Sequence, residues 1–193
     1  RLPASGELTL LGLIVSIVIA IPLGILAAVN PGSPVDHACR MIATAGVSLP
    51  VFFLGLILVY FFYYILGWAP APLGRLDVFF SPPPKVTGFY LIDSLVAGQF
   101  DTFRAALAQL LLPALTLGIF SLAPIARMTR ASMLAVLASD FVRTARASGL
   151  TPYTVIITYA FRNAMLPVVT TLGMVFSFLL GANVLVEKVF AWP

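Results

Sequence analysis

Charged residues are scarce in this sequence. Of its 193 residues only 9% are Asp, Glu, Lys or Arg, whereas 61% are hydrophobic. A soluble domain has about 25% charged residues, and this chain has too few polar residues to build the shell that a soluble core needs. The composition therefore places the chain among membrane proteins. Its net charge of +4 does not indicate a nucleic-acid binder, because the arginines cluster between apolar runs.

Metal ligands, thiols and phosphate-binding loops are also scarce. The chain has one cysteine, Cys39, and one histidine, His37, which excludes an internal disulfide and a thiolate metal cluster. We expect this pair to be an ordinary loop feature and not a metal site. The glycine-rich pattern with Lys and Ser or Thr that cradles phosphates does not occur, so the chain does not bind ATP in that way. We expect no cofactor and no metal on this chain.

Four uncharged, apolar stretches are present, and crossing a membrane takes about 20 such residues. They are 8–29, 42–66, 105–126 and 163–186. If each stretch is a helix, apolar residues occupy all of its faces, unlike in an amphipathic surface helix. The pattern predicts an all-α fold, a polytopic membrane helical bundle forming one domain over 1–193. Since the sequence begins without Met and ends directly after an apolar run, we expect a piece of a longer protein.

The charges between these stretches predict their direction. Segment 67–104 has three basic and three acidic residues, whereas segment 127–162 has five arginines against Asp140 alone. Cytoplasmic loops carry an excess of Lys and Arg. We therefore expect 127–162 to be cytoplasmic and 67–104 to be extracytoplasmic, with the short loop after residue 29 inside and both ends of the chain outside.

Prolines occur in or near all four stretches, at Pro22, Pro50, Pro113 and Pro167. Proline removes a backbone hydrogen bond and bends a helix, which membrane helices tolerate when neighbours satisfy the freed carbonyl. Two interpretations stay open. The bends surround a cavity that changes shape, or they are kinks accommodated by packing.

Asp, Glu, His, Lys and Arg are absent from the interior of the four stretches. Proton- and sodium-driven transporters place such groups at membrane depth. General acid–base catalysis likewise needs groups within hydrogen-bond reach of one another, and no Ser–His or paired-Asp arrangement occurs there. The chain is therefore not expected to be an enzyme. If it moves a solute uphill, the energy comes from a partner protein.

Segment 127–162 has the most specific pattern. Ser139 is a predicted N-cap, followed by Asp140 in the first helical turn. Gly149 is suited to a left-handed helix stop. Thr151 and Pro152 are typical of a cap followed by proline in the first turn of a second helix. The sequence thus predicts a helix, a tight turn at Gly149 and a second helix running toward the membrane.

We call residues 139–150 the elbow. Its predicted helix has a polar face and an apolar face. The polar face carries Asp140, Arg143 and Arg146. The apolar face carries Phe141, Val142 and Ala145. Small residues near the turn permit close approach to a groove on another protein: Ala145, Ala147, Ser148 and Gly149. Docking to a partner is one interpretation; a solvated loop whose arginines only set topology, and binding to anionic lipid head groups, are the others.

Several motifs resemble one known family. Residues 140–150 (DFVRTARASGL) and 161–167 (FRNAMLP) resemble the cytoplasmic loop of permease subunits of bacterial ABC importers, in the dipeptide/oligopeptide/nickel branch. Three further motifs resemble that branch: 112–118 (LPALTLG), 126–130 (ARMTR) and 186–193 (VEKVFAWP). The family loop has Glu-Ala-Ala followed by Gly, where this chain has Arg143, Thr144 and Ala145, with Gly149 retained. This departure is typical of the peptide branch and leaves no glutamate role to carry over.

The resemblance implies a six-helix permease of the MetI-like fold, of which this chain would supply about four transmembrane helices. It implies a bacterial inner-membrane location and a coupling loop that fits an ATPase groove. The coupling residues would be Asp140, Arg143, Thr144, Ala145, Arg146, Ala147, Ser148, Gly149 and Leu150. The implied partners are a second homologous permease, two cytoplasmic ATPases that bind ATP and magnesium, and an extracytoplasmic solute-binding protein.

The solute stays open among peptides, nickel and sugars, with di- and oligopeptides favoured by the branch. The sequence also leaves open which helix faces line the pathway and whether the permease pair is homo- or heterodimeric. Two alternative functions remain at this point. One is an ion-coupled secondary transporter or channel, and the other is a structural membrane subunit that moves no solute.

Overall fold

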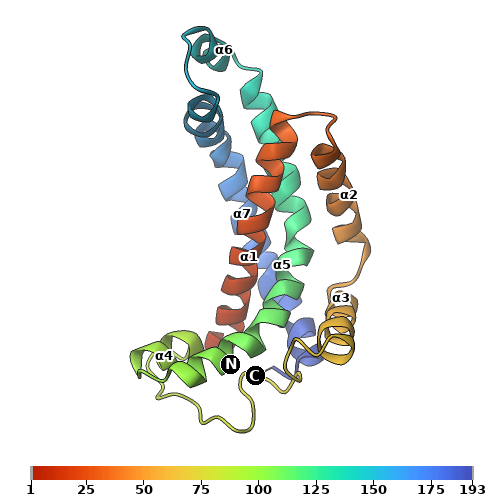
Figure 1. Ribbon diagram of the computed structural model, residues 1–193, viewed down its shortest axis with the longest axis vertical. Coiled ribbons are helices and arrows are strands. Elements are labelled where there is room, and N and C mark those ends of the chain that lie inside the picture. The colour runs from red at the N-terminus through yellow and green to blue at the C-terminus, as the bar shows by residue number, and fades with distance from the viewer. Residues whose placement is uncertain (1, 193) are drawn as a thin grey trace. The chain divides into compact units, whose positions relative to one another are not determined.

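A computed structural model describes residues 2–192, and describes only the backbone of residues 43 and 45–48. Within residues 2–192 the chain forms helices and no strand, which confirms the predicted all-α fold (Figure 1). In chain order the elements are α1 (Leu2–Val29), α2 (Pro34–Ser48), α3 (Val51–Leu58), the π-helix η1 (Val59–Ile65), α4 (Tyr90–Val96), α5 (Phe100–Leu137), α6 (Asp140–Ala147), the π-helix η2 (Thr154–Phe161) and α7 (Arg162–Val189). The expected domain, 1–193, extends one residue beyond this part at each end.

Three helices are long and apolar enough to cross a membrane. They are Leu2–Val29 with 28 residues, Phe100–Leu137 with 38 and Thr154–Val189 with 36, the last combining η2 and α7. At about 1.5 Å per residue even the shortest measures roughly 40 Å, which exceeds the roughly 30 Å of hydrocarbon in a bilayer. Each of the three contains one of the predicted stretches 8–29, 105–126 and 163–186.

The predicted stretch 42–66 is not one uninterrupted helix. Helix α2 begins earlier, at Pro34, and ends at Ser48, and α3 begins only at Val51. The break falls at Pro50, whose φ of −60° and ψ of 139° are extended. Proline disfavours helical geometry in the residue before it and cannot donate a hydrogen bond to the preceding turn. The apolar helix after the break, Val51–Ile65, is shorter than the three long ones.

Segment 127–162 is more helical than expected. Helix α5 continues through the first two arginines of this segment as far as Leu137, because residues 127–137 contain no glycine or proline to stop it. Only the part from Ser139 onward forms the elbow. The segment 67–104 likewise contains the short helix α4, and α5 begins at Phe100 within it.

The chain divides into two compact units. We call the described residues 2–15, 49–120 and 176–192 the loop unit, because they include residues 66–89 between η1 and α4, which we call the long segment. Residues 16–48 and 121–175 form the elbow unit. In each unit a glycine lets α1 approach α5 closely: a Cβ at Gly12 would lie 2.8 Å from Leu117 Cβ, and one at Gly24 would lie 2.7 Å from Thr129 Cβ. Small residues at such contacts are typical of membrane helix pairs.

Candidate functional site

The elbow is a short helix closed by a glycine turn. Gly149 has a φ of +75°, a left-handed conformation in which glycine alone meets no side-chain penalty. Its N–H donates to the carbonyl of Arg146 at 3.1 Å, and the N–H of Leu150 donates to that of Ala145 at 3.4 Å. These two bonds make a Schellman ending, which satisfies the last carbonyls of α6. The predicted helix stop at Gly149 is confirmed.

Ser139 stands at the N-cap position of α6, but its side chain makes no capping hydrogen bond. Its hydroxyl donates instead to the carbonyl of Val136, at the end of α5. The predicted capping role of this hydroxyl is therefore wrong. The physical reason is competition, because α5 ends directly before the elbow and its last carbonyls also lack partners. Asp140 does lie in the first turn of α6, as expected.

One face of α6 is buried. Val142 is fully buried and Ala145 is 5% exposed. Both belong to a hydrophobic cluster of the elbow unit that joins the ends of α1 and α5 to η2 and the start of α7. Its other buried members are Ala28, Met133, Val155, Ala160 and Ala164. The cluster therefore packs the elbow against α1, α5, η2 and α7.

The other face of α6 is exposed. All the predicted coupling residues except Ala145 are exposed, either on α6 or in the turn that follows it: Asp140, Arg143, Thr144, Arg146, Ala147, Ser148, Gly149 and Leu150. Phe141 was predicted to lie on the apolar face, but it is 45% exposed. The buried residues of α6 are Val142 and Ala145, and Phe141 lies beside them. Arg143 pairs with Asp140 at 3.6 Å, with both side chains exposed. Such a pair contributes little to stability and leaves both groups accessible.

The turn after Gly149 starts the second helix as predicted. The Thr151 hydroxyl accepts a hydrogen bond from the Thr154 N–H at 3.4 Å, which is the geometry of an N-cap. Pro152 follows in the first helical turn. The helix then continues as the π-helix η2, whose Val155 packs in the same cluster as Val142 of the elbow.

The four predicted helix-bending prolines do not share one environment. Pro22 lies inside α1 and Pro167 inside α7, and Pro113 lies inside α5. Pro50 instead separates α2 from α3. It therefore ends a helix where a bend was predicted.

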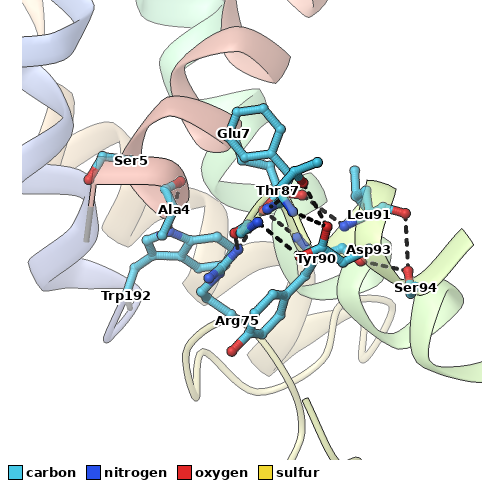
Figure 2. Close-up of polar contacts among 12 residues, drawn as sticks. Ala4, Ser5, Glu7, Arg75, Thr87, Tyr90, Leu91, Asp93, Ser94 and Trp192 are labelled. Atoms are coloured by element: carbon cyan, nitrogen blue, oxygen red, sulfur yellow. Dashed lines mark hydrogen bonds and ion pairs between the residues drawn. The ribbon is translucent and has the colours of Figure 1, made fainter. Parts of the chain in front are cut away.

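A buried ionic cluster in the loop unit was missed by the sequence analysis (Figure 2). The Glu7 carboxylate is 7% exposed. It accepts hydrogen bonds from Arg75 Nη2 at 2.8 Å, from the Tyr90 N–H at 3.2 Å and from the Leu91 N–H at 2.9 Å. The last two belong to the first turn of α4, so Glu7 of α1 caps α4 through space, where a negative charge is stabilised.

Arg75 joins this cluster to the rest of the long segment. It donates to the carbonyl of Gly88 at 2.9 Å, and its guanidinium lies 3.5 Å from the centroid of the Tyr90 ring. A cation over an aromatic face is attracted by the ring. Glu7 and Arg75 are 68 residues apart in the chain, and no local sequence pattern signals a pair of that separation.

Asp93 organises the turn before α4. Its carboxylate accepts hydrogen bonds from the Thr87 hydroxyl at 2.7 Å and from the N–H groups of Val86, Thr87 and Gly88 at 3.2, 2.8 and 2.9 Å. Burial by itself raises the pKa of Asp93, but the hydrogen bonds from Thr87, Gly88 and Val86 outweigh it and lower the pKa to about 2. Asp93 is therefore ionised at neutral pH and holds this turn closed.

The end of α7 is attached to the start of α1 within the loop unit. Glu187 accepts hydrogen bonds from the Ser5 hydroxyl and from Asn183 Nδ2, and Asn183 also donates to the Ser5 carbonyl at 3.1 Å. The Trp192 indole N–H donates to the carbonyl of Ala4 at 3.5 Å (Figure 2). From the sequence, Glu187 was identified only as part of the motif 186–193.

A second ion pair fastens the elbow unit. Asp36, at the start of α2, is 2% exposed and accepts two hydrogen bonds from Arg130 of α5, one at 2.5 Å from Nε and one at 3.1 Å from Nη2. It also accepts the N–H of Gly32 at 2.9 Å. The Arg130 side chain first, and then the Gly32 N–H, lower the pKa of Asp36 to about 2. Arg130 was predicted only as part of the cytoplasmic positive charge.

Among the residues whose side chains are described, no group of three or more His, Cys, Asp and Glu is placed to hold a metal ion. Two features of the structure are therefore candidates for a functional role. One is an elbow with a buried inner face and an exposed basic outer face. The other is a long segment fastened by buried carboxylates.

Comparison with known proteins identifies the family of this chain. The sequence model of the family described as binding-protein-dependent transport system inner membrane component matches residues 20–193. The di/tripeptide transport system permease protein of Pseudomonas aeruginosa is 45% identical over 191 residues, covering 99% of this chain and 56% of that protein. The dipeptide transport system permease protein of Escherichia coli K12 is 44% identical over 196 residues, covering 100% of this chain and 57% of that protein.

A third relative is the probable D,D-dipeptide transport system permease protein of Escherichia coli K12, 46% identical over 191 residues, with 99% of this chain and 56% of that protein covered. The chain therefore spans a little over half the length of the curated relatives that it matches. All three names describe permeases for short peptides.

Proposed function

The chain belongs to the family of binding-protein-dependent transport system inner membrane components, and from this premise we propose that it is part of the permease of an ATP-driven importer of short peptides. A multi-pass inner-membrane location follows from the family and from the three long apolar helices. Peptide as the solute is supported by the names of the relatives, all permeases for dipeptides or tripeptides.

The elbow is proposed as the contact with a cytoplasmic ATPase. The observation that carries this proposal is its two-sided structure: Val142 and Ala145 are buried against three other helices, while the basic residues Arg143 and Arg146 are exposed. The small residues beside Gly149 let a partner approach the backbone closely. When ATP closes the ATPases, motion of the elbow is passed through the buried cluster to α1, α5 and α7.

The proposed assembly has four kinds of subunit. A second homologous permease completes the pathway, two ATPases bind ATP and magnesium, and an extracytoplasmic binding protein delivers the peptide. Two buried acidic groups of this chain support an external energy source, because Glu7 and Asp36 are each paired with an arginine. A carboxylate held by a permanent cation is poorly suited to bind and release a coupling proton.

Import by the reconstituted full-length system tests the proposal. The full-length permease pair, its ATPases and its binding protein are placed in liposomes, and uptake of radiolabelled L-alanyl-L-alanine is followed. We expect accumulation that requires ATP and is insensitive to a protonophore. Accumulation driven by a proton gradient without ATP would identify an ion-coupled transporter instead, and unchanged cellular uptake after deletion of the gene would identify a structural subunit.

A further inference from the structure

A hollow lies between the long segment and the start of α5. It has a volume of about 550 Å³, and all its lining residues belong to the loop unit. They are Pro70, Asp77 and Phe80 from the long segment, and Asp101, Arg104, Ala105, Ala108 and Gln109 from α5. Pockets for small molecules measure about 300–1,000 Å³, so the hollow is large enough for a small organic solute.

Charges of both signs line this hollow without neutralising one another. Asp101 and Arg104 are exposed, and neither forms an ion pair within residues 2–192. Asp77 uses one carboxylate oxygen to accept the Phe79 N–H at 3.3 Å. Two carboxylates and one guanidinium are therefore available to a molecule that carries both a positive and a negative group.

A buried amide adds a neutral donor to the same hollow. Gln109 is 6% exposed, and its Nε2 is buried with no hydrogen-bond partner in the part of the chain that the structure describes. A buried donor without a partner is unfavourable. Gln109 lines the hollow, so a rotation of its side-chain amide would let a carbonyl group on a bound molecule become the partner of Nε2.

We propose that this hollow binds a short zwitterionic peptide. The peptide ammonium is bound by Asp77 and Asp101, its carboxylate by Arg104 and its amide carbonyl by Gln109 Nε2. Phe80 and the alanines of α5 provide the apolar contacts for side chains. Charge-assisted hydrogen bonds of this kind are stronger than neutral ones and fix the orientation of the bound molecule.

The assigned ligand is a peptide and not a simple ion. An anion would meet two carboxylates against one guanidinium, and a metal ion would meet Arg104. Only a molecule with separated opposite charges and a carbonyl uses all four polar residues. The proposal rests on the proposed function in its choice of peptide, and adds a binding site on this chain outside the predicted cytoplasmic elbow.

Binding of chemically blocked peptides tests this site. The full-length permease–ATPase complex in lipid nanodiscs, without binding protein and without ATP, is equilibrated with radiolabelled L-alanyl-L-alanine. Its N-acetyl derivative and its C-terminal amide are measured in parallel. We expect saturable binding of the free peptide and about tenfold weaker binding of each blocked form, as for the loss of one charge-assisted hydrogen bond.

Substitutions assign each charge of the peptide to its residue. Arg104→Gln should abolish the preference for the free carboxylate and retain the preference for the free amine. The double substitution Asp77→Asn and Asp101→Asn should do the opposite. Gln109→Leu should weaken binding of all three peptides. Arg162→Gln, which removes an exposed arginine outside the hollow, should leave all three affinities unchanged.

The outcomes separate this site from the importer itself. Absence of saturable binding, equal binding of free and blocked peptides, or unchanged preferences in the variants overturns the site. If one of these results is obtained and ATP-driven import of the same peptide persists, the binding site is rejected and the importer proposal stands. Binding with the expected preferences but without ATP-driven import supports the site and contradicts the importer.

Discussion

The buried carboxylates of Glu7 and Asp93 hold in place a segment of the loop unit that contains no long helix. Glu7 and Asp93 together accept seven hydrogen bonds from the segment 75–91. Breaking a buried ion pair by removing one partner costs about 3–5 kcal/mol, because the other charge stays buried without compensation. Glu7 forms such a pair with Arg75, and loss of the Asp93 carboxylate would leave buried donors without their acceptor. The stability of the loop unit should therefore depend on these two residues far more than on exposed charges.

Glu7 offers a direct test of this dependence. Glu7→Gln removes the charge that Arg75 and the first turn of α4 share, so we expect the unfolding temperature of the full-length protein in detergent to fall. The expected loss is about 3–5 kcal/mol. Asp140→Asn, which removes the same charge from a side chain that is 98% exposed, is the control and should change stability by less than about 1 kcal/mol. Equal effects of the two substitutions would contradict the assigned role of Glu7.

Asp93 should make stability depend on acid pH. Its pKa is about 2 in the folded protein and 3.8 in the absence of structure. A carboxyl group with a lowered folded pKa stabilises the fold above its unfolded pKa, and this contribution is lost as pH falls through the folded pKa. The difference in unfolding temperature between the wild type and Asp93→Asn should thus be constant from pH 7 to about 4 and shrink between about 4 and 2.

A companion variant checks the cause of that acid dependence. Thr87→Val removes the hydroxyl that donates to Asp93 at 2.7 Å, so the folded pKa should rise toward the unfolded value. The loss should still begin near pH 4, but it should be smaller and should be complete at a higher pH than in the wild type. A Thr87→Val profile identical to that of the wild type would show that this hydroxyl does not lower the pKa of Asp93.

At the residue scale, the helix stop and the helix cap that were predicted correctly depend on residues close together in the sequence. Gly149 and Thr151 were identified because helix stops and caps use particular residue types within a few positions. Glu7, Arg75, Asp36 and Arg130 were not paired, because their partners are 68 and 94 residues away. A single sequence has no signal for contacts at that distance.

Elements contact one another closely where side chains are smallest. A Cβ placed on Gly24 of α1 would lie 2.7 Å from Thr129 Cβ and 2.9 Å from the Ala126 carbonyl oxygen of α5. The carbonyl belongs to the backbone, so it cannot rotate away as a flexible side chain would. The contact of α1 with α5 in the elbow unit therefore requires a residue without a side chain at this position.

Gly24→Ala should accordingly separate these helices and destabilise the protein. Overpacking a close contact costs about 1–3 kcal/mol, and the unfolding temperature in detergent should fall. Gly173→Ala in α7 is the matched control, since a Cβ there would meet nothing within 4 Å and alanine favours a helix over glycine. A tolerated Gly24→Ala would show that the two helices are not in this close contact.

At the element scale, three long helices were predicted because their apolar stretches reach the roughly 20 residues that crossing a bilayer takes. The fourth stretch, 42–66, failed as one helix because composition alone does not report backbone geometry. Pro50 was identified as a bend, but its extended conformation separates α2 from α3. The continuation of α5 to Leu137 was missed for a related reason: arginine marks a membrane boundary but does not end a helix.

The whole molecule combines three long apolar helices with an elbow that is buried on one side and exposed on the other. Family membership was predicted from motifs over nearly the whole chain and is confirmed by the family match over 20–193. The chain spans a little over half of its relatives, so the transport cycle that we propose is one of the full-length protein with its proposed partners. The exposed face of the elbow is the part of this chain through which we propose that ATP hydrolysis acts.

Transport by a Gly149→Val variant tests this central claim most directly. Valine strongly disfavours the φ of +75° at this turn, so the elbow loses its shape while the buried cluster around Val142 remains. The matched control is Gly98→Val, which alters a glycine of similar φ, +68°, also with nothing within 4 Å of its Cβ position, in the loop unit.

Both variants are introduced into the full-length reconstituted importer, and ATP-driven uptake of L-alanyl-L-alanine is measured after their amounts in the membrane have been matched. We expect Gly149→Val to reduce uptake to less than about one-tenth, as for a loss of about 1.4 kcal/mol or more in coupling, and Gly98→Val to retain most of it. Normal uptake by Gly149→Val, or an equal loss in both variants, would contradict the assignment of the elbow as the coupling element.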